Sequence, residues 1–280
     1  MKIMVVGAGQ MGAGIAQVSA QAGFTTYLND LNREIINKGM GGIENNLTRD
    51  VQKGKMTEQE KEKILARIQA SDQLSPAKEC DLVIEAIVEN LEIKQSLFKQ
   101  LDEICPPKTI LASNTSSLPI TEIAAVTKRP EKVIGMHFMQ PVPVMTLVEI
   151  IRGLATSEET YQKVEEISRA MGKFPVSVRD VPGFVSNRVL QVMINEAIYC
   201  VYEGVATPEG IDEIMKRGMN HPMGPLALAD FIGLDTVLSI LEIMYKGYGD
   251  PKFRPCPLLR QYVKAGWLGR KSGRGFYEYK

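Results

Sequence analysis

The sequence predicts an α/β fold in which a parallel sheet covered by helices precedes an all-helical domain. Two observations carry this prediction. Over the first 180 residues, short apolar runs rich in β-branched residues alternate with helical patterns. Beyond residue 183 the apolar residues recur with helical periodicity instead. At 280 residues, the chain is long enough for two domains that each bury a core.

Seven short segments read as strands: residues 2–6, 24–29, 81–87, 109–112, 132–137, 144–151 and 173–178. The interval between the second and third is unusually long, from about residue 32 to residue 70, and holds two helical patterns broken near residues 54–57. It predicts a helical hairpin that projects from the sheet. A further helix begins near Ser157, between the last two strands.

The segment Arg179-Asp-Val-Pro-Gly183 contains two breakers and predicts a linker. It separates a domain of residues 1–180 from a helical domain of residues 184–280, with helices expected at 184–203, 208–217, 225–245 and 256–265. A domain of roughly 95 residues lies below the usual domain size, so a second copy would enlarge its core. We therefore expect a homodimer through the helical domain.

The first strand runs directly into a glycine-rich loop with the spacing Gly7-x-Gly9-x-x-Gly12. In this motif Gly7 permits a tight turn, Gly9 lets a pyrophosphate approach the backbone, and Gly12 lets helix and strand pack closely. The N–H groups and the positive dipole end of the following helix favour phosphate. The loop, which includes Gln10 and Met11, predicts a Rossmann-type dinucleotide-binding domain.

Asp30 closes the second strand, about 20 residues beyond the glycines, where an acidic residue binds the adenosine ribose in such folds. Its carboxylate accepts a hydrogen bond from the 2′-hydroxyl and repels a 2′-phosphate. Arg33 lies nearby, but it reads more simply as a solvated charge on the next helix. The sequence therefore predicts NAD rather than NADP.

Composition excludes several classes of function. The formal net charge is zero, so the protein has no overall positive charge that would attract nucleic acid or an acidic membrane surface. No apolar run approaches the roughly 20 residues that span a bilayer. The cysteines fit no metal-binding or redox spacing, so we expect reduced thiols and no metal site: Cys80, Cys105, Cys200 and Cys256. The first strand begins at residue 2 or 3, which leaves no room for a targeting segment, and we expect a cytoplasmic protein.

His137 ends the fifth predicted strand, at the edge where open α/β sheets bind their ligands. Glu149 on the next strand can fix the tautomer of the imidazole and leave the second ring nitrogen to move a proton. Oxidation of an alcohol by hydride transfer requires such a proton acceptor. A strand-end histidine that bonds only to backbone groups is equally consistent with this position. His221, in a turn-rich segment before a helix, reads as a packing or capping residue.

The segment 113–117, Ser-Asn-Thr-Ser-Ser, follows another strand and should lie at the same edge. These groups can bind a nicotinamide or a substrate oxygen, or cap the following helix. No base is adjacent, which argues against a nucleophilic serine. The hairpin carries Arg49, Lys53 and Lys55, which can hold phosphates or form a solvated helix face.

From end to end the chain resembles the short-chain L-3-hydroxyacyl-CoA dehydrogenases, and most of all their bacterial 3-hydroxybutyryl-CoA dehydrogenase members. The motifs that carry the resemblance are Ala-Ser-Asn-Thr-Ser-Ser-Leu at 112–118, the stretch 137–149, Asp-Val-Pro-Gly-Phe-Val-Ser-Asn-Arg at 180–188, His-Pro-Met-Gly-Pro-Leu-Ala-Leu-Ala-Asp at 221–230, and Gly-Arg-Lys-Ser-Gly-Arg-Gly-Phe-Tyr at 269–277. Together they are more specific than the glycine loop.

The resemblance implies roles for particular residues. His137 is expected to be the general acid/base acting on the C3 hydroxyl, with Glu149 orienting it. Ser116 and Asn187 are expected to bind the reacting oxygens of the substrate.

Further roles follow from the same resemblance. Asn114 should lie between substrate and nicotinamide, and Glu89 and Lys94 should help to seat the cofactor. Arg49 and Lys53 fall where the family's cationic groups meet coenzyme A. One departure is Gln140, where many members have asparagine, and it bears on substrate preference.

These observations predict an NAD-dependent enzyme that interconverts a (S)-3-hydroxyacyl-CoA and the 3-oxoacyl-CoA, with 3-hydroxybutyryl-CoA and acetoacetyl-CoA favoured. Two alternatives stay open. A β-hydroxyacid dehydrogenase has the same architecture but acts on a free acid and uses a lysine. A non-catalytic NAD(H)-binding protein would keep the fold without turnover.

Overall fold

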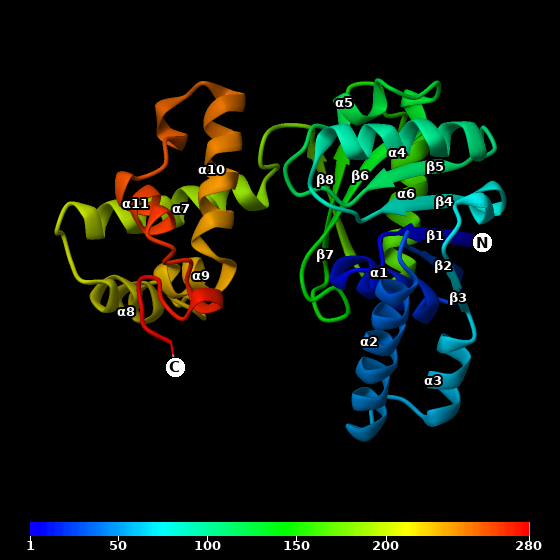
Figure 1. Cartoon of the computed structure of the whole chain (residues 1–280), viewed down its shortest axis with the longest axis horizontal. Coiled ribbons are helices and arrows are strands. Elements are labelled where there is room, and N and C mark those ends of the chain that lie inside the picture. The colour runs from blue at the N-terminus through cyan, green and yellow to red at the C-terminus, as the bar shows by residue number, and fades with distance from the viewer. Residues whose placement is uncertain (280) are drawn as a thin grey trace. The chain divides into compact units, whose positions relative to one another are not determined.

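The computed structural model describes residues 1–279, and the chain divides into the units Met1–Asp180 and Val181–Lys280 (Figure 1). The first unit is built on one eight-stranded sheet of order β3-β2-β1-β4-β5-β6-β7-β8. Its strands are β1 (Lys2–Val6), β2 (Thr25–Asn29), β3 (Ile68–Ser71), β4 (Leu82–Glu85), β5 (Ile110–Ser113), β6 (Val133–Phe138), β7 (Leu147–Arg152) and β8 (Phe174–Arg179). The predicted α/β class is confirmed.

Neighbouring strands are parallel except β6 and β7, which pair antiparallel. The expectation of a parallel sheet is therefore wrong at this one pair. The physical reason is the short connection, residues 139–146, because a parallel crossover needs a dozen or more residues. The helix α6 (Glu158–Ala170) supplies such a crossover between the parallel strands β7 and β8.

The first helix, α1 (Gln10–Gln21), begins directly after Gly9, and residues 12–20 of it are all buried. Gly7 has a φ of 104°, a conformation that favours glycine. A Cβ at Gly12 would lie 1.7 Å from the Gly7 carbonyl oxygen. The turn between β1 and α1 thus requires glycine at two of its positions.

The predicted hairpin consists of α2 (Arg33–Gln52) and α3 (Glu58–Leu65), which extend together from the sheet (Figure 1). Asn32 caps α2, and Thr57 with Glu60 forms a capping box at the start of α3. The hairpin ends earlier than expected, because residues 68–71 form the edge strand β3 beside β2. Only Ile68 of this strand is buried, so the sequence shows no strand periodicity there.

Gly41 lies inside α2, and a Cβ placed on it would meet nothing within 4 Å. We expect Gly41→Ala to raise the free energy of unfolding by about 0.5–1 kcal/mol, because alanine loses less backbone entropy in a helix. Calorimetric or urea unfolding measures the change. Gly54 is the matched control: its surroundings are equally open but its φ is 67°, so Gly54→Ala should lower stability. Equal effects of the two substitutions would contradict this reasoning.

Further helices complete the first unit: η1 (Ser75–Glu79), α4 (Leu91–Ile104), α5 (Ile120–Ala124) and η2 (Pro130–Lys132). One apolar core joins the sheet to α1, α2 and α6, and its members include Ile3, Val5, Ile15, Leu28, Ile43, Ile84, Ile134 and Val164. This packing holds the glycine loop and the carboxyl ends of the strands in fixed positions.

The second unit is helical: α7 (Ser186–Tyr202), α8 (Pro208–Gly218), α9 (Pro225–Ile232), α10 (Leu234–Tyr248), η3 (Pro251–Phe253), α11 (Pro257–Lys264) and η4 (Arg270–Ser272). The helix expected at 225–245 is in fact two helices, because Gly233 takes a φ of 100° between them. The first helix starts two residues late because Phe184 has a φ of 50°. Within the part of the chain that the structure describes, no helix is long and apolar enough to cross a membrane.

Candidate functional site

The carboxyl ends of β1, β4, β5 and β6 meet at one edge of the sheet, because these strands are parallel neighbours. Glu85 at the end of β4 is in register with Ser113 at the end of β5. The loop after β5 then carries Asn114 and Ser116, and His137 lies near the end of β6. The topology therefore brings most of the predicted site residues of the first unit to this edge.

Asp30 lies directly after β2, beside the glycine loop. Its Oδ2 accepts a hydrogen bond of 2.9 Å from the backbone N–H of Ala8. Gly9 and Gln10 are exposed, whereas the Met11 side chain packs partly against the core. A Cβ on Gly9 would meet nothing within 4 Å, so the backbone of the loop is open to a ligand at this residue.

A cavity of about 580 Å³ lies between the glycine loop, one face of α2 and the connection between β6 and β7. Lys38 and Asn46 line it from α2, and Gln140 lines it from the connection. Arg49 and Lys53 are exposed further along the hairpin and do not line it. The sequence interpretation missed Lys38 and Asn46, although their i, i+8 spacing with Gly42 between them marks one helix face.

The connection between β6 and β7 is held by Lys173, which is only 8% exposed. Its Nζ donates to the carbonyl oxygens of Val142 at 2.5 Å and Met145 at 2.8 Å. Burial lowers the pKa of this ammonium below its usual range. The contacts fix the backbone of the segment that carries Gln140.

His137 and Glu149 face each other across the antiparallel strands β6 and β7. Directly opposite residues project on the same side of a sheet, so the pairing follows from the register. The distance from His137 Nδ1 to Glu149 Oε2 is 2.8 Å, and the residues are 8% and 2% exposed. A carboxylate acceptor at Nδ1 places the proton of the neutral ring there and leaves a lone pair on Nε2.

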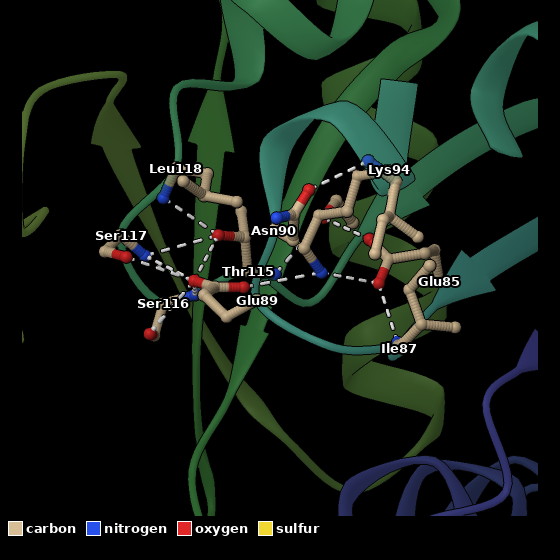
Figure 2. A network of polar contacts seen from close by, with 11 residues as sticks. Glu85, Ile87, Glu89, Asn90, Lys94, Thr115, Ser116, Ser117 and Leu118 are labelled. Carbon is tan, nitrogen blue, oxygen red and sulfur yellow. Dashed lines mark hydrogen bonds and ion pairs between the residues drawn. The ribbon is translucent and has the colours of Figure 1, made fainter. Parts of the chain in front are cut away.

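Asn114 and Ser116 are both anchored by hydrogen bonds. Asn114 Oδ1 accepts from the backbone N–H of Phe138 at 2.9 Å, which ties the loop after β5 to the strand that carries His137. Figure 2 shows Glu89 beneath the same loop, where its Oε1 accepts from the N–H of Ser116 at 2.9 Å and from its hydroxyl at 3.2 Å. The polar side chains at this edge therefore form a connected network.

Lys94 in the first turn of α4 is 1% exposed, and its Nζ lies 2.6 Å from Glu85 Oε1 and 3.4 Å from Glu89 Oε2. Burial alone would raise the pKa of the Glu89 carboxyl, but the Lys94 ammonium and the hydrogen bonds from the 115–117 loop hold it below its usual range. The structure thus places the Lys94 ammonium inside the protein, against carboxylates.

Asn187 is the second residue of α7 and belongs to the second unit. His221 follows the C-terminal end of α8, where its N–H donates to the Met215 carbonyl. All four cysteines are free thiols. Among residues 1–279, no group of acidic, histidine and cysteine side chains is arranged to hold a metal ion.

Comparison with known proteins matches both units. Residues 2–181 match the family model "3-hydroxyacyl-CoA dehydrogenase, NAD binding domain", and residues 183–279 match "3-hydroxyacyl-CoA dehydrogenase, C-terminal domain". The probable 3-hydroxybutyryl-CoA dehydrogenase of Bacillus subtilis is 66% identical over 279 residues, covering 100% of this chain and 97% of that protein. The 3-hydroxybutyryl-CoA dehydrogenase of Bradyrhizobium diazoefficiens is 53% identical, over 100% of this chain and 95% of that one.

A solved structure agrees with these relatives. The crystal structure of (S)-3-hydroxybutyryl-CoA dehydrogenase from Ralstonia eutropha superposes with a TM-score of 0.98 at 50% identity, covering 100% of this chain and 99% of that one. This solved structure therefore shares the fold of the chain as well as half of its sequence, over nearly the full length of both proteins. The chain therefore belongs to the 3-hydroxyacyl-CoA dehydrogenase family and is an NAD-dependent oxidoreductase.

Proposed function

We propose that this protein interconverts (S)-3-hydroxybutyryl-CoA and acetoacetyl-CoA with NAD as the hydride acceptor or donor. The observation that carries the proposal is the buried His137–Glu149 pair at the carboxyl edge of the sheet, with its 2.8 Å contact. The full-length relatives named 3-hydroxybutyryl-CoA dehydrogenase, at 50% to 66% identity, support the same substrate.

The residues at the edge of the sheet fit the cofactor. The open backbone at Gly9 and the N-terminus of α1 suit a pyrophosphate, and Asp30 suits an unphosphorylated ribose. Glu89 and Lys94 support the loop on the other side of this edge. When bound, NAD accepts the hydride that the substrate carbon loses.

In the oxidative direction, His137 Nε2 removes the proton from the C3 hydroxyl as the hydride leaves C3. Glu149 stabilises the positive charge that the ring acquires and keeps it oriented. Ser116 and Asn187 donate hydrogen bonds to the reacting oxygens of the substrate. Asn114 lies between the substrate and the nicotinamide. In the reductive direction, the same imidazole returns the proton.

The coenzyme A portion meets the hairpin in this proposal. Arg49 and Lys53 provide exposed positive charge for its phosphates, and Lys38 and Asn46 supply polar groups in the cavity. The helical unit supplies Asn187 and joins two copies into a homodimer. We place the protein in the cytoplasm.

The test follows loss of NADH absorbance with acetoacetyl-CoA, beside matched reactions with NADPH and with free acetoacetate. Turnover with NADH and the CoA ester alone supports the proposal. Turnover with free acetoacetate in place of the ester would assign the protein to the β-hydroxyacid dehydrogenases. Measurable NADH binding without turnover on any acyl-CoA would indicate a non-catalytic binder.

Asp30 allows a separate prediction about the cofactor. In Asp30→Asn the amide oxygen still accepts from the Ala8 N–H, so the turn is preserved. The repulsion of a 2′-phosphate is lost, and like-charge contacts at interfaces cost several kcal/mol. We expect the ratio of kcat/KM for NADH to that for NADPH to fall by about tenfold or more. An unchanged ratio would show that Asp30 does not select the cofactor.

A further inference from the structure

Glu85, at the end of β4, has no part in the proton transfer proposed above, yet it is a carboxylate with 0% exposure. Its partner Lys94 is 1% exposed, and their charged atoms lie 2.6 Å apart. Acidic and basic side chains are almost never fully buried unless they are paired. Because this ion pair is fully buried and lies close to the proposed site, it is a candidate for a functional role.

Glu85 joins three elements of the fold through its two oxygens. Its Oε1 accepts from the N–H of Ile87 at 2.7 Å as well as from Lys94, and its Oε2 accepts from the hydroxyl of Ser113 at 2.6 Å. The carboxylate therefore fixes the end of β4, the first turn of α4 and the end of β5 relative to one another.

Lys94 also forms an ion pair with Glu89, whose Oε2 lies 3.4 Å from the ammonium, and so links Glu89 to Glu85 (Figure 2). The other oxygen, Oε1, accepts from Thr115 Oγ1 at 2.7 Å, from the N–H and hydroxyl of Ser116, and from the N–H and hydroxyl of Ser117. Five donors exceed the roughly two acceptor directions of one carboxylate oxygen, so the hydroxyl groups share them. Glu89 therefore holds both the backbone and the hydroxyl groups of this loop.

We propose that Glu85 and Lys94 are positioning residues that hold Glu89, and through it the loop of Ser116, in the arrangement that binds the reacting oxygen of the substrate. This inference rests on the proposed role of Ser116. Without the ammonium, two carboxylates face each other without a cation between them, and Glu89 turns toward water. The loop then loses the acceptor of its two backbone N–H groups.

Three variants separate positioning from mere stability: Glu85→Gln, Lys94→Met and the double variant. Lys94→Met leaves the buried Glu85 carboxylate without its cation, and Glu85→Gln leaves the Lys94 ammonium with only Glu89, at 3.4 Å, so each single substitution should lower the Tm. The double variant removes both charges and should recover much of the Tm. We expect its kcat/KM for acetoacetyl-CoA to remain about 10- to 100-fold below wild type, since small displacements of a substrate-binding group cost this much.

Arg129→Lys provides the matched control, because Arg129 forms its ion pair with Asp102 of the same helix, α4. Arg129 forms a buried ion pair with Asp102 near the other end of α4, at 2.6 Å. This variant should lower the Tm while leaving kcat/KM close to wild type. It shows what destabilisation of the first unit alone does to the kinetics.

Amide exchange of residues 113–118, measured in the full chain without substrate, tests the loop independently of turnover. Faster exchange in the double variant, together with lowered kcat/KM, supports the inference. Recovery of kcat/KM in the double variant, unchanged exchange, or a loss confined to NADH affinity overturns it. If wild type does not turn over acetoacetyl-CoA, the proposed function fails, while the exchange data still judge the positioning of the loop.

Discussion

Replacement of His137 by glutamine is expected to reduce kcat by roughly 10²- to 10⁴-fold, the usual contribution of a positioned general acid or base. Glutamine has no group that exchanges a proton near neutral pH, but it fills a similar space opposite Glu149. Because the glycine loop and Asp30 are untouched, the affinity for NADH should change little. Steady-state kinetics with acetoacetyl-CoA, together with NADH fluorescence titration, measures both quantities.

Glu149→Gln is the companion variant. The amide oxygen can still face Nδ1, so the orientation of the ring is partly kept, but the charge that stabilises the protonated ring is gone. Its loss of kcat should be smaller than that of His137→Gln. Near wild-type turnover of His137→Gln would show that another group moves the proton.

The second large effect concerns two glycines of one loop with different tasks. In Gly12→Ala the new Cβ would lie 1.7 Å from the Gly7 carbonyl oxygen, so the turn between β1 and α1 must move. We expect a loss of about 4 kcal/mol or more in stability, because Gly7 and Gly12 are both buried and the backbone has little room to shift. Thermal unfolding and the yield of folded protein measure this loss.

Gly9→Ala separates binding from folding. Gly9 has a φ of −65° and open surroundings, so alanine fits the backbone without strain. The methyl group should instead obstruct the pyrophosphate, which approaches the bare backbone here. We expect wild-type stability with NADH affinity at least about tenfold weaker. A stable Gly12→Ala, or a Gly9→Ala that binds NADH normally, would contradict these assignments.

The parts of the fold that could be predicted are those with a local signature. The glycine spacing after β1 and the alternation of strands and helices can each be recognised within a short segment of sequence, and the structure contains the elements that they predict. The edge strand β3 was missed because only Ile68 of its residues is buried, so its pairing with β2 depends on a distant segment. The break at Gly233 lies inside a continuous helical pattern and is visible only as a positive φ.

The candidate site divides in the same way. His137 and Glu149 could be proposed together because they lie on consecutive predicted strands, and the structure places them opposite each other. The sequence could not show that Lys94 is buried against Glu85, because that contact depends on how α4 docks on the sheet. Nor could it show which hairpin side chains line the cavity, because the sequence does not distinguish the charged residues of α2 that face the cavity from those that face solvent.

The antiparallel pairing of β6 and β7 separates the residues that transfer the proton, which lie on the strands, from Gln140, which lies in the connection and lines the cavity. The proton-transfer pair is separated by only twelve residues and is fixed by strand register, whereas Gln140 lies in the connection that lines the cavity. Lys173, directly before β8, donates hydrogen bonds to that connection at the carbonyl groups of Val142 and Met145. The sequence of this connection can therefore vary without any change in the strand register that pairs His137 with Glu149.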